Sequence, residues 1–92
     1  MGSGIYHDNF SEVFKWLLDK TGVSCYQICF FTHLDQGYLS RLKNGSKTNP
    51  SAETVIKIAL AICCYSKAVK LSEIEALFRS VGRSLNFVSA KF

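Results

Sequence analysis

The stretch from Ser24 to Gly45, SCYQICFFTHLDQGYLSRLKNG, most constrains what this chain can fold into. Its small polar residues fall where two short helices would begin and end. Ser24, with Gln27 three positions later, forms the pattern of a capping box, which satisfies free backbone N–H groups at a helix start. Asp35 offers a second N-cap, and Asn44-Gly45 is typical of a left-handed helix end. The stretch therefore predicts two short helices joined by a tight turn.

The second of these helices has few residues that can be buried, so most of its side chains are expected on the surface. Only Leu39 and Leu42, three positions apart, form a buried pair. The pattern leaves the other residues pointing outward, and none of them is acidic: Gln36, Gly37, Tyr38, Ser40, Arg41 and Lys43. A short helix that shows an amide, a phenol and a guanidinium has the chemistry of a major-groove reader.

The spacing resembles the helix-turn-helix of Cro/CI-type phage repressors. The matching positions are Ser24, Ile28, Cys29, Leu34, Asp35, Leu39, Ser40, Leu42 and Gly45. The next segment, PSAETVIKIA at residues 50–59, resembles the family pattern P-S-x-E-T-L-x-K-I-A. The resemblance covers about residues 10–65. It implies a sequence-specific regulator, most often a repressor, that binds double-stranded DNA with the helix of residues 35–44 in the major groove.

The resemblance also implies which residues meet DNA. Base contacts would come from Gln36, Tyr38 and Arg41, while Gly37 occupies a base-reading position without a side chain. Phosphate contacts would come from backbone N–H groups at a helix start, from polar side chains of the recognition helix and from the loop after it: Ser24, Cys25, Ser40, Lys43, Asn44 and Lys47. Such repressors commonly bind as dimers, so we expect a homodimer on a two-fold-related site.

Two positions depart from the family pattern. His33 stands at the turn glycine, and a non-glycine residue with positive φ is uncommon although histidine tolerates it. In the family pattern, an acidic residue at the position of Lys43 often pairs with an arginine of the first helix. Leu18 stands at the position of that arginine in this chain. Both halves of the pair are missing together.

Three further helices complete an all-α, five-helix, phage-repressor-like domain at residues 10–82. The first, to about Lys20, buries Phe10, Val13, Phe14 and Leu17. The helix after Pro50, capped by Asn49 or Ser51, buries Val55, Ile58, Ala59, Ile62 and Cys63. The last opens with a capping box at Ser72–Glu75, buries Ile74, Leu77, Phe78 and Val81, and ends at Gly82.

Both ends of the chain flank this domain. Residues 1–9 form an N-terminal lead, in which Met1-Gly2-Ser3-Gly4 is typical of a start or cloning remnant. Residues 83–92 carry four large apolar side chains, so they either fold back on the core or pair with a second subunit. The resemblance favours the second reading, a dimer arm.

The four cysteines allow a thiolate metal site or a redox switch, but the chain has no C-x-x-C spacing. We therefore interpret Cys29 and Cys63 as small buried hydrophobes. His7 and His33 fit no nucleophile or metal pattern, and no glycine-rich phosphate loop occurs. We expect no enzyme, no metal and no cofactor.

The net charge of +4 is mild, but the chain has no acidic residue between Asp35 and Glu53, where Arg41, Lys43 and Lys47 lie. This distribution favours a phosphate-facing surface. We expect a cytoplasmic protein without membrane association, because no long apolar run or signal peptide occurs. The alternative is a protein-interaction module, or an antitoxin that also binds DNA, with a protein partner at Phe30, Phe31 or the C-terminal tail.

Overall fold

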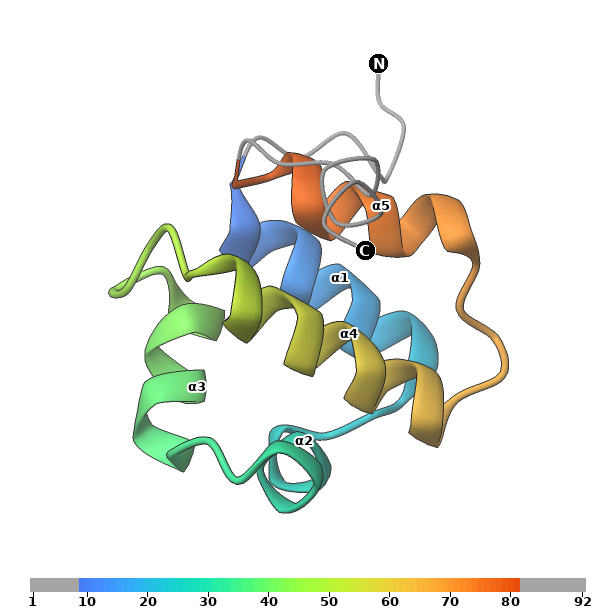
Figure 1. Ribbon diagram of the computed structural model, residues 1–92, viewed down its shortest axis with the longest axis horizontal. Helices are drawn as coiled ribbons and strands as arrows, with labels where there is room; N and C mark the ends of the chain where they lie inside the picture. The colour runs from blue at the N-terminus through green and yellow to red at the C-terminus, as the bar shows by residue number, and fades with distance from the viewer. Residues whose placement is uncertain (1–8, 82–92) are drawn as a thin grey trace.

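The computed structural model describes residues 9–81, in which there are five helices and no strand (Figure 1). The all-α class predicted from the sequence is confirmed. The helices are α1 (Phe10–Thr21), α2 (Cys25–Thr32), α3 (Gln36–Asn44), α4 (Ala52–Tyr65) and α5 (Leu71–Arg79). The end of the last helix predicted at Gly82, and the tail of residues 83–92, lie outside the described residues.

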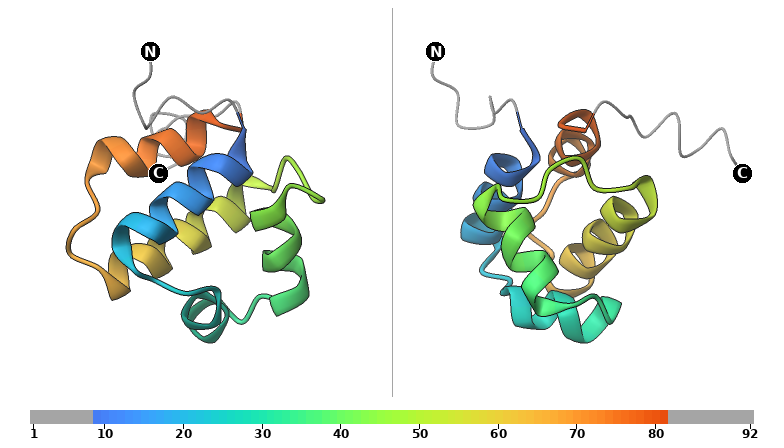
Figure 2. Two further views of the ribbon diagram at one scale, coloured as in Figure 1. Left: turned by 180° about the vertical axis from the view of Figure 1, so that it is seen from behind. Right: turned by 90° about the vertical axis from the view of Figure 1, so that its left-hand side faces the viewer.

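The five helices close into a ring around one core. In order around the ring, α1 packs on α3, α3 on α2, α2 on α4, α4 on α5, and α5 on α1 (Figure 2, right). Every helix contributes at least one fully buried side chain: Phe14, Leu17, Ile28, Leu39, Leu42, Val55, Ile58, Ile62 and Leu77. The short α3 is thus held from behind by its neighbours, which leaves its other side open.

Short polar side chains fix where the first four helices begin. The Asn9, Ser24, Asp35 and Ser51 side chains each accept a hydrogen bond from a backbone N–H three residues later. These caps satisfy groups that have no partner inside the helix. The caps predicted at Ser24 and Asp35 are confirmed, and of the two predicted alternatives for α4 the cap is Ser51.

The predicted start of α5 at Ser72 is wrong. The helix begins at Leu71 with Lys70 as its N-cap, and the Glu73 carboxylate accepts a hydrogen bond from the Lys70 backbone N–H at 2.8 Å. Glu73 is buried and also pairs with Lys20 of α1. Lys20 in turn lies over the Trp16 ring, with Nζ 5.5 Å from its centroid. The acid therefore ties α5 to α1, which a pattern within one helix does not indicate.

The interpretation of the cysteines as buried is also wrong. Cys63 and Cys64 are exposed, and Cys25 and Cys29 are half-buried. At 100° per residue, the position after Ile62 turns away from the core at the end of α4. Partial burial, with smaller contributions from Cys25 and Asp35, raises the pKa of the Cys29 thiol, which disfavours the reactive thiolate.

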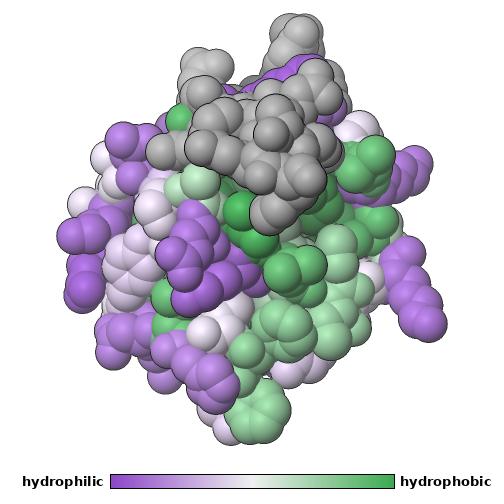
Figure 3. Space-filling model, viewed as in Figure 1, coloured by the Kyte–Doolittle hydropathy of each residue, from purple (hydrophilic) through white to green (hydrophobic). Residues whose placement is uncertain are grey.

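Large apolar side chains are also exposed. Tyr26 and Phe30 of α2 are 68% and 70% exposed, whereas Phe31 is less exposed and meets the Tyr65 ring edge-on at 6.3 Å. Figure 3 shows hydrophobic surface gathered over α4 and down to α2, with mainly polar surface on the α3 side. We call this the α2–α4 face and define it by Tyr26, Phe30, Phe31, Leu60, Cys64 and Tyr65.

Candidate nucleic-acid interface

The turn between α2 and α3 is held by backbone geometry. His33 adopts the left-handed conformation, with φ of 64°, and its N–H donates to the Cys29 carbonyl at 2.7 Å. The expected positive φ at this non-glycine position is confirmed. The Thr32 hydroxyl adds two bonds, donating to the Ile28 carbonyl and accepting from the Leu34 N–H. Sequence reasoning missed Thr32, which helps to fix the angle between the helices.

On α3, Leu39 and Leu42 are completely buried, as predicted. Exposed positions carry Gln36, Gly37, Ser40, Arg41 and Lys43. Tyr38 does not point outward as expected: it is half-buried and packs against the core. At 100° per residue it lies only about 40° from Leu42 around the helix, so its ring covers the edge of the buried stripe.

Gly37 gives the outward face of α3 its shape. A Cβ atom at Gly37 would lie 2.9 Å from Asp35 Oδ2 and 3.5 Å from a guanidinium nitrogen of Arg41. That Asp35 oxygen accepts the capping bond from the Tyr38 N–H at 3.0 Å. The missing side chain therefore leaves room for the cap and lets the Arg41 guanidinium lie next to the helix backbone.

Of the two backbone N–H groups predicted to contact phosphate at the start of α2, those of Ser24 and Cys25, only one is available. The Ser24 N–H donates to Gln27 Oε1 at 3.0 Å, and the Ser24 hydroxyl accepts from the Gln27 N–H at 3.1 Å. Both groups are therefore engaged in the capping box, and Ser24 cannot offer its N–H without breaking that box. Within residues 9–81, the Cys25 N–H has no such bond and points out of the helix start.

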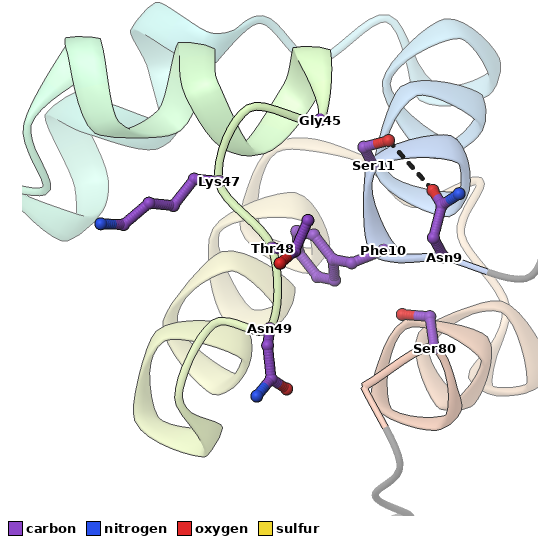
Figure 4. Close-up of a pocket in the computed structure, with 8 residues that line it drawn as sticks. All are labelled: Asn9, Phe10, Ser11, Gly45, Lys47, Thr48, Asn49 and Ser80. Atoms are coloured by element: carbon purple, nitrogen blue, oxygen red, sulfur yellow. Dashed lines mark hydrogen bonds between the residues drawn. The ribbon is translucent and has the colours of Figure 1, made fainter.

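The remaining predicted contacts lie at the end of α3 and in the loop after it. Lys43 and Asn44 are exposed, and Asn44 accepts a hydrogen bond from the Ser46 N–H at 2.8 Å through Oδ1. The Lys47 N–H donates to the Arg41 carbonyl at 3.1 Å, which fixes the loop backbone. The Lys47 side chain extends away from the loop (Figure 4).

A hollow of about 270 Å³ lies on the other side of this loop, against the start of α1 and the end of α5. Its lining contains no carboxylate and consists of Asn9, Phe10, Ser11, Gly45, Lys47, Thr48, Asn49 and Ser80. The Ser11 hydroxyl donates to Asn9 Oδ1 at 3.0 Å. Sequence reasoning missed Ser11, Thr48 and Asn49, because contacts between segments far apart in the chain leave no local pattern.

Arg41, Lys43 and Lys47 remain available for an anionic partner. None of the three forms a salt bridge with another residue of the described segment, where the ion pairs are formed by Lys20, Lys57 and Arg79. The acidic residues nearest in sequence are Asp35, which caps α3, and Glu53, which pairs with Lys57 at 3.4 Å. From Gln36 to Ala52 the chain therefore exposes three cations and no carboxylate.

The chain matches no protein-family model, no curated protein and no solved structure. Within residues 9–81, no three His, Cys, Asp or Glu side chains are grouped so that they could hold a metal ion. None of the helices described between those residues is long and apolar enough to cross a membrane.

Proposed function

We propose that this protein is a sequence-specific double-stranded-DNA-binding transcriptional regulator, most simply a repressor, which inserts α3 into the major groove. One observation carries the proposal. Gln36 and Arg41, two exposed side chains with long reach, flank the side-chain-free position at Gly37 on a helix anchored by two buried leucines. The resemblance to Cro/CI-type repressors adds support. The protein would act in the cytoplasm as a homodimer on a two-fold-related site.

The two flanking side chains suit base edges. Arginine can bond both O6 and N7 of guanine, and glutamine can bond both N6 and N7 of adenine. Each good bidentate pair contributes about 1–3 kcal/mol of discrimination against a wrong base. Gly37 lets the α3 backbone approach the groove floor. Tyr38, at the edge of the buried stripe, would contact DNA only with its hydroxyl end.

Phosphate contacts would fix the position of α3. Lys43 and Lys47 would supply charge, while Ser40, Asn44 and the Cys25 N–H would supply hydrogen-bond donors. These two exposed lysines would release about two counterions, giving a slope of log K against log salt of about −1.8 per protomer.

The test compares Arg41→Ala with Lys47→Ala on a site obtained by selection from random duplexes. Arg41→Ala should cost about 1–3 kcal/mol on the preferred site and relax the preference at one base pair. Lys47→Ala should weaken every duplex alike and reduce the salt slope by about 1. Affinities for the preferred site and its single-base variants, at several salt concentrations, separate the two effects. Equal losses on all variants for Arg41→Ala would rule out its base-reading role.

A second candidate, a protein-interaction module or an antitoxin, is supported by the exposure of Tyr26 and Phe30. An aromatic protein interface would bind with little dependence on salt, whereas DNA binding through cations falls steeply as salt rises. If no duplex is enriched in the selection and a protein partner binds independently of salt, this second function replaces the first.

A further inference from the structure

The α2–α4 face carries no charged side chain. From Val23 to Leu34 the chain has no Asp, Glu, Lys or Arg, and the same holds from Ile58 to Ser66. Aromatic enrichment with depletion of Lys, Glu and Asp distinguishes the centre of a protein–protein interface from the rest of a surface.

The members of the face form one surface. On α2, Tyr26 and Phe30 are one turn apart and therefore neighbours. Phe31 contacts Tyr65 of α4 ring to ring. On α4, Leu60 and Cys64 are also one turn apart, and Leu60 is 56% exposed. Figure 3 shows the corresponding hydrophobic surface running from α4 to α2 without a polar break.

The area of the face is large enough for pairing. With about 200 Å² for a whole aromatic side chain and somewhat less for leucine, the exposed fractions correspond to roughly 500 Å² on one copy. Such a patch is near the upper end of what a monomer exposes, about 300–600 Å². Two copies would together remove roughly 1,000 Å², the lower limit for a specific interface.

The charge distribution favours a second copy as the occupant. Each copy carries a formal charge of +4, so two copies repel each other electrostatically overall. The α2–α4 face carries no charge, so two copies can meet there without that cost. An apolar patch without charges is also self-complementary, which a two-fold interface requires.

We infer that two copies of this protein associate through their α2–α4 faces, with Phe30 near the two-fold axis. The contact is independent of DNA and uses no residue of α3, and the C-terminal half of α4 lies on the other side of the molecule from α3 (Figure 1). The rival occupant is the chain's own residues 82–92. They follow Val81 at the end of α5, which lies across the ring from α2 in Figures 1 and 2.

Sedimentation equilibrium of the full chain, without DNA and with a thiol reductant, tests this inference. The wild type should show a monomer–dimer equilibrium. Phe30→Asp should raise its dissociation constant about 30-fold or more, as expected for a central aromatic contact. Leu60→Asp, on the other helix of the face, should act in the same direction. Leu71→Asp is the matched control, because Leu71 is 73% exposed but lies on α5, outside the face.

Each possible result of these measurements either supports or contradicts a dimer through the α2–α4 face. The replaced side chains are exposed, so circular dichroism should show unchanged helix content in all three variants. A wild type that stays monomeric up to about 1 mM, well above the dissociation constants of specific complexes, would overturn it. So would a dimer that Leu71→Asp weakens as much as Phe30→Asp. If only a chain ending at Val81 dimerises, residues 82–92 are the occupant and the inference is wrong. Failure to select a DNA site would leave this measurement unchanged.

Discussion

Replacing Glu73 by glutamine tests whether a buried charge holds α5 onto α1. Glu73 is 8% exposed, pairs with Lys20 and accepts the Lys70 backbone N–H at 2.8 Å. Burial disfavours its charged form, but the hydrogen bonds from Lys20 and from the Lys70 backbone, with the charges of both lysines, outweigh this and lower its pKa. Glutamine keeps the shape and one acceptor oxygen but removes the charge.

The expected loss of folding stability lies between the values for breaking an exposed ion pair and a buried one. Exposed pairs contribute about 0.2–1 kcal/mol, and breaking a fully buried pair costs about 3–5 kcal/mol. The Glu73 side chain is 9% exposed and that of Lys20 is 29% exposed, so Lys20 can regain water. We expect Glu73→Gln to lower the free energy of unfolding by about 1–2 kcal/mol, or the melting temperature by about 4–16 °C.

Urea unfolding followed by circular dichroism between pH 7 and pH 3 measures this loss. A lowered folded-state pKa stabilises the protein at a pH above the unfolded value, near 4.5, and the contribution disappears as the pH falls through the folded-state pKa. The wild-type and Glu73→Gln curves should therefore converge in acid. Glu75→Gln is the control, because its contact with Arg79 at 3.4 Å is far more exposed and should contribute only about 0.3–0.5 kcal/mol. Equal losses for both variants at pH 7, or a gap that does not narrow as the pH falls below 4.5, would refute the reasoning.

Two further predictions concern the turn and the start of α3. His33→Gly should raise the free energy of unfolding by about 0.5–1 kcal/mol in urea titrations, because glycine adopts the φ of 64° without steric cost; a less stable variant would show that the His33 side chain makes a compensating contact. Asp35→Ser should keep the N-cap, since serine caps equally well, and remove a negative charge beside the proposed DNA contacts. Affinity for the selected duplex should rise several-fold at low salt and little at high salt, and a loss of affinity would indicate that the Asp35 carboxylate itself contacts DNA.

The sequence predicted those features that depend on neighbours within a few residues. Ser24 and Asp35 were identified as caps because a cap and its target N–H are three residues apart. Leu39 and Leu42 were placed in the core by spacing alone. His33 was expected at positive φ because its position in the stretch, compared with the family pattern, requires a turn there.

The features that sequence reasoning missed depend on contacts between distant segments. Ser72 has the spacing of a capping box, but Glu73 bonds to the Lys70 N–H and pairs with Lys20 of α1, and that partner cannot be deduced from the local pattern. Periodicity placed Cys63 on a buried stripe, whereas the position after Ile62 turns away from the core and Cys63 is exposed. For the candidate site, the helix and its exposed residues were predicted, but the engaged N–H of Ser24 and the half-buried ring of Tyr38 were not.

The position of Trp16 gives the protein an internal optical probe. It is the only tryptophan in the chain, so its emission reports one place, the part of α1 where Lys20 lies over the indole and pairs with Glu73 of α5. Separation of α5 from α1 would release the ammonium from the ring and admit water to the half-buried indole, which shifts indole emission to longer wavelengths. Because α2 and α3 carry no tryptophan, a change in their arrangement that leaves α1 and α5 in place would not alter this signal. Time-resolved fluorescence could therefore follow the docking of α5.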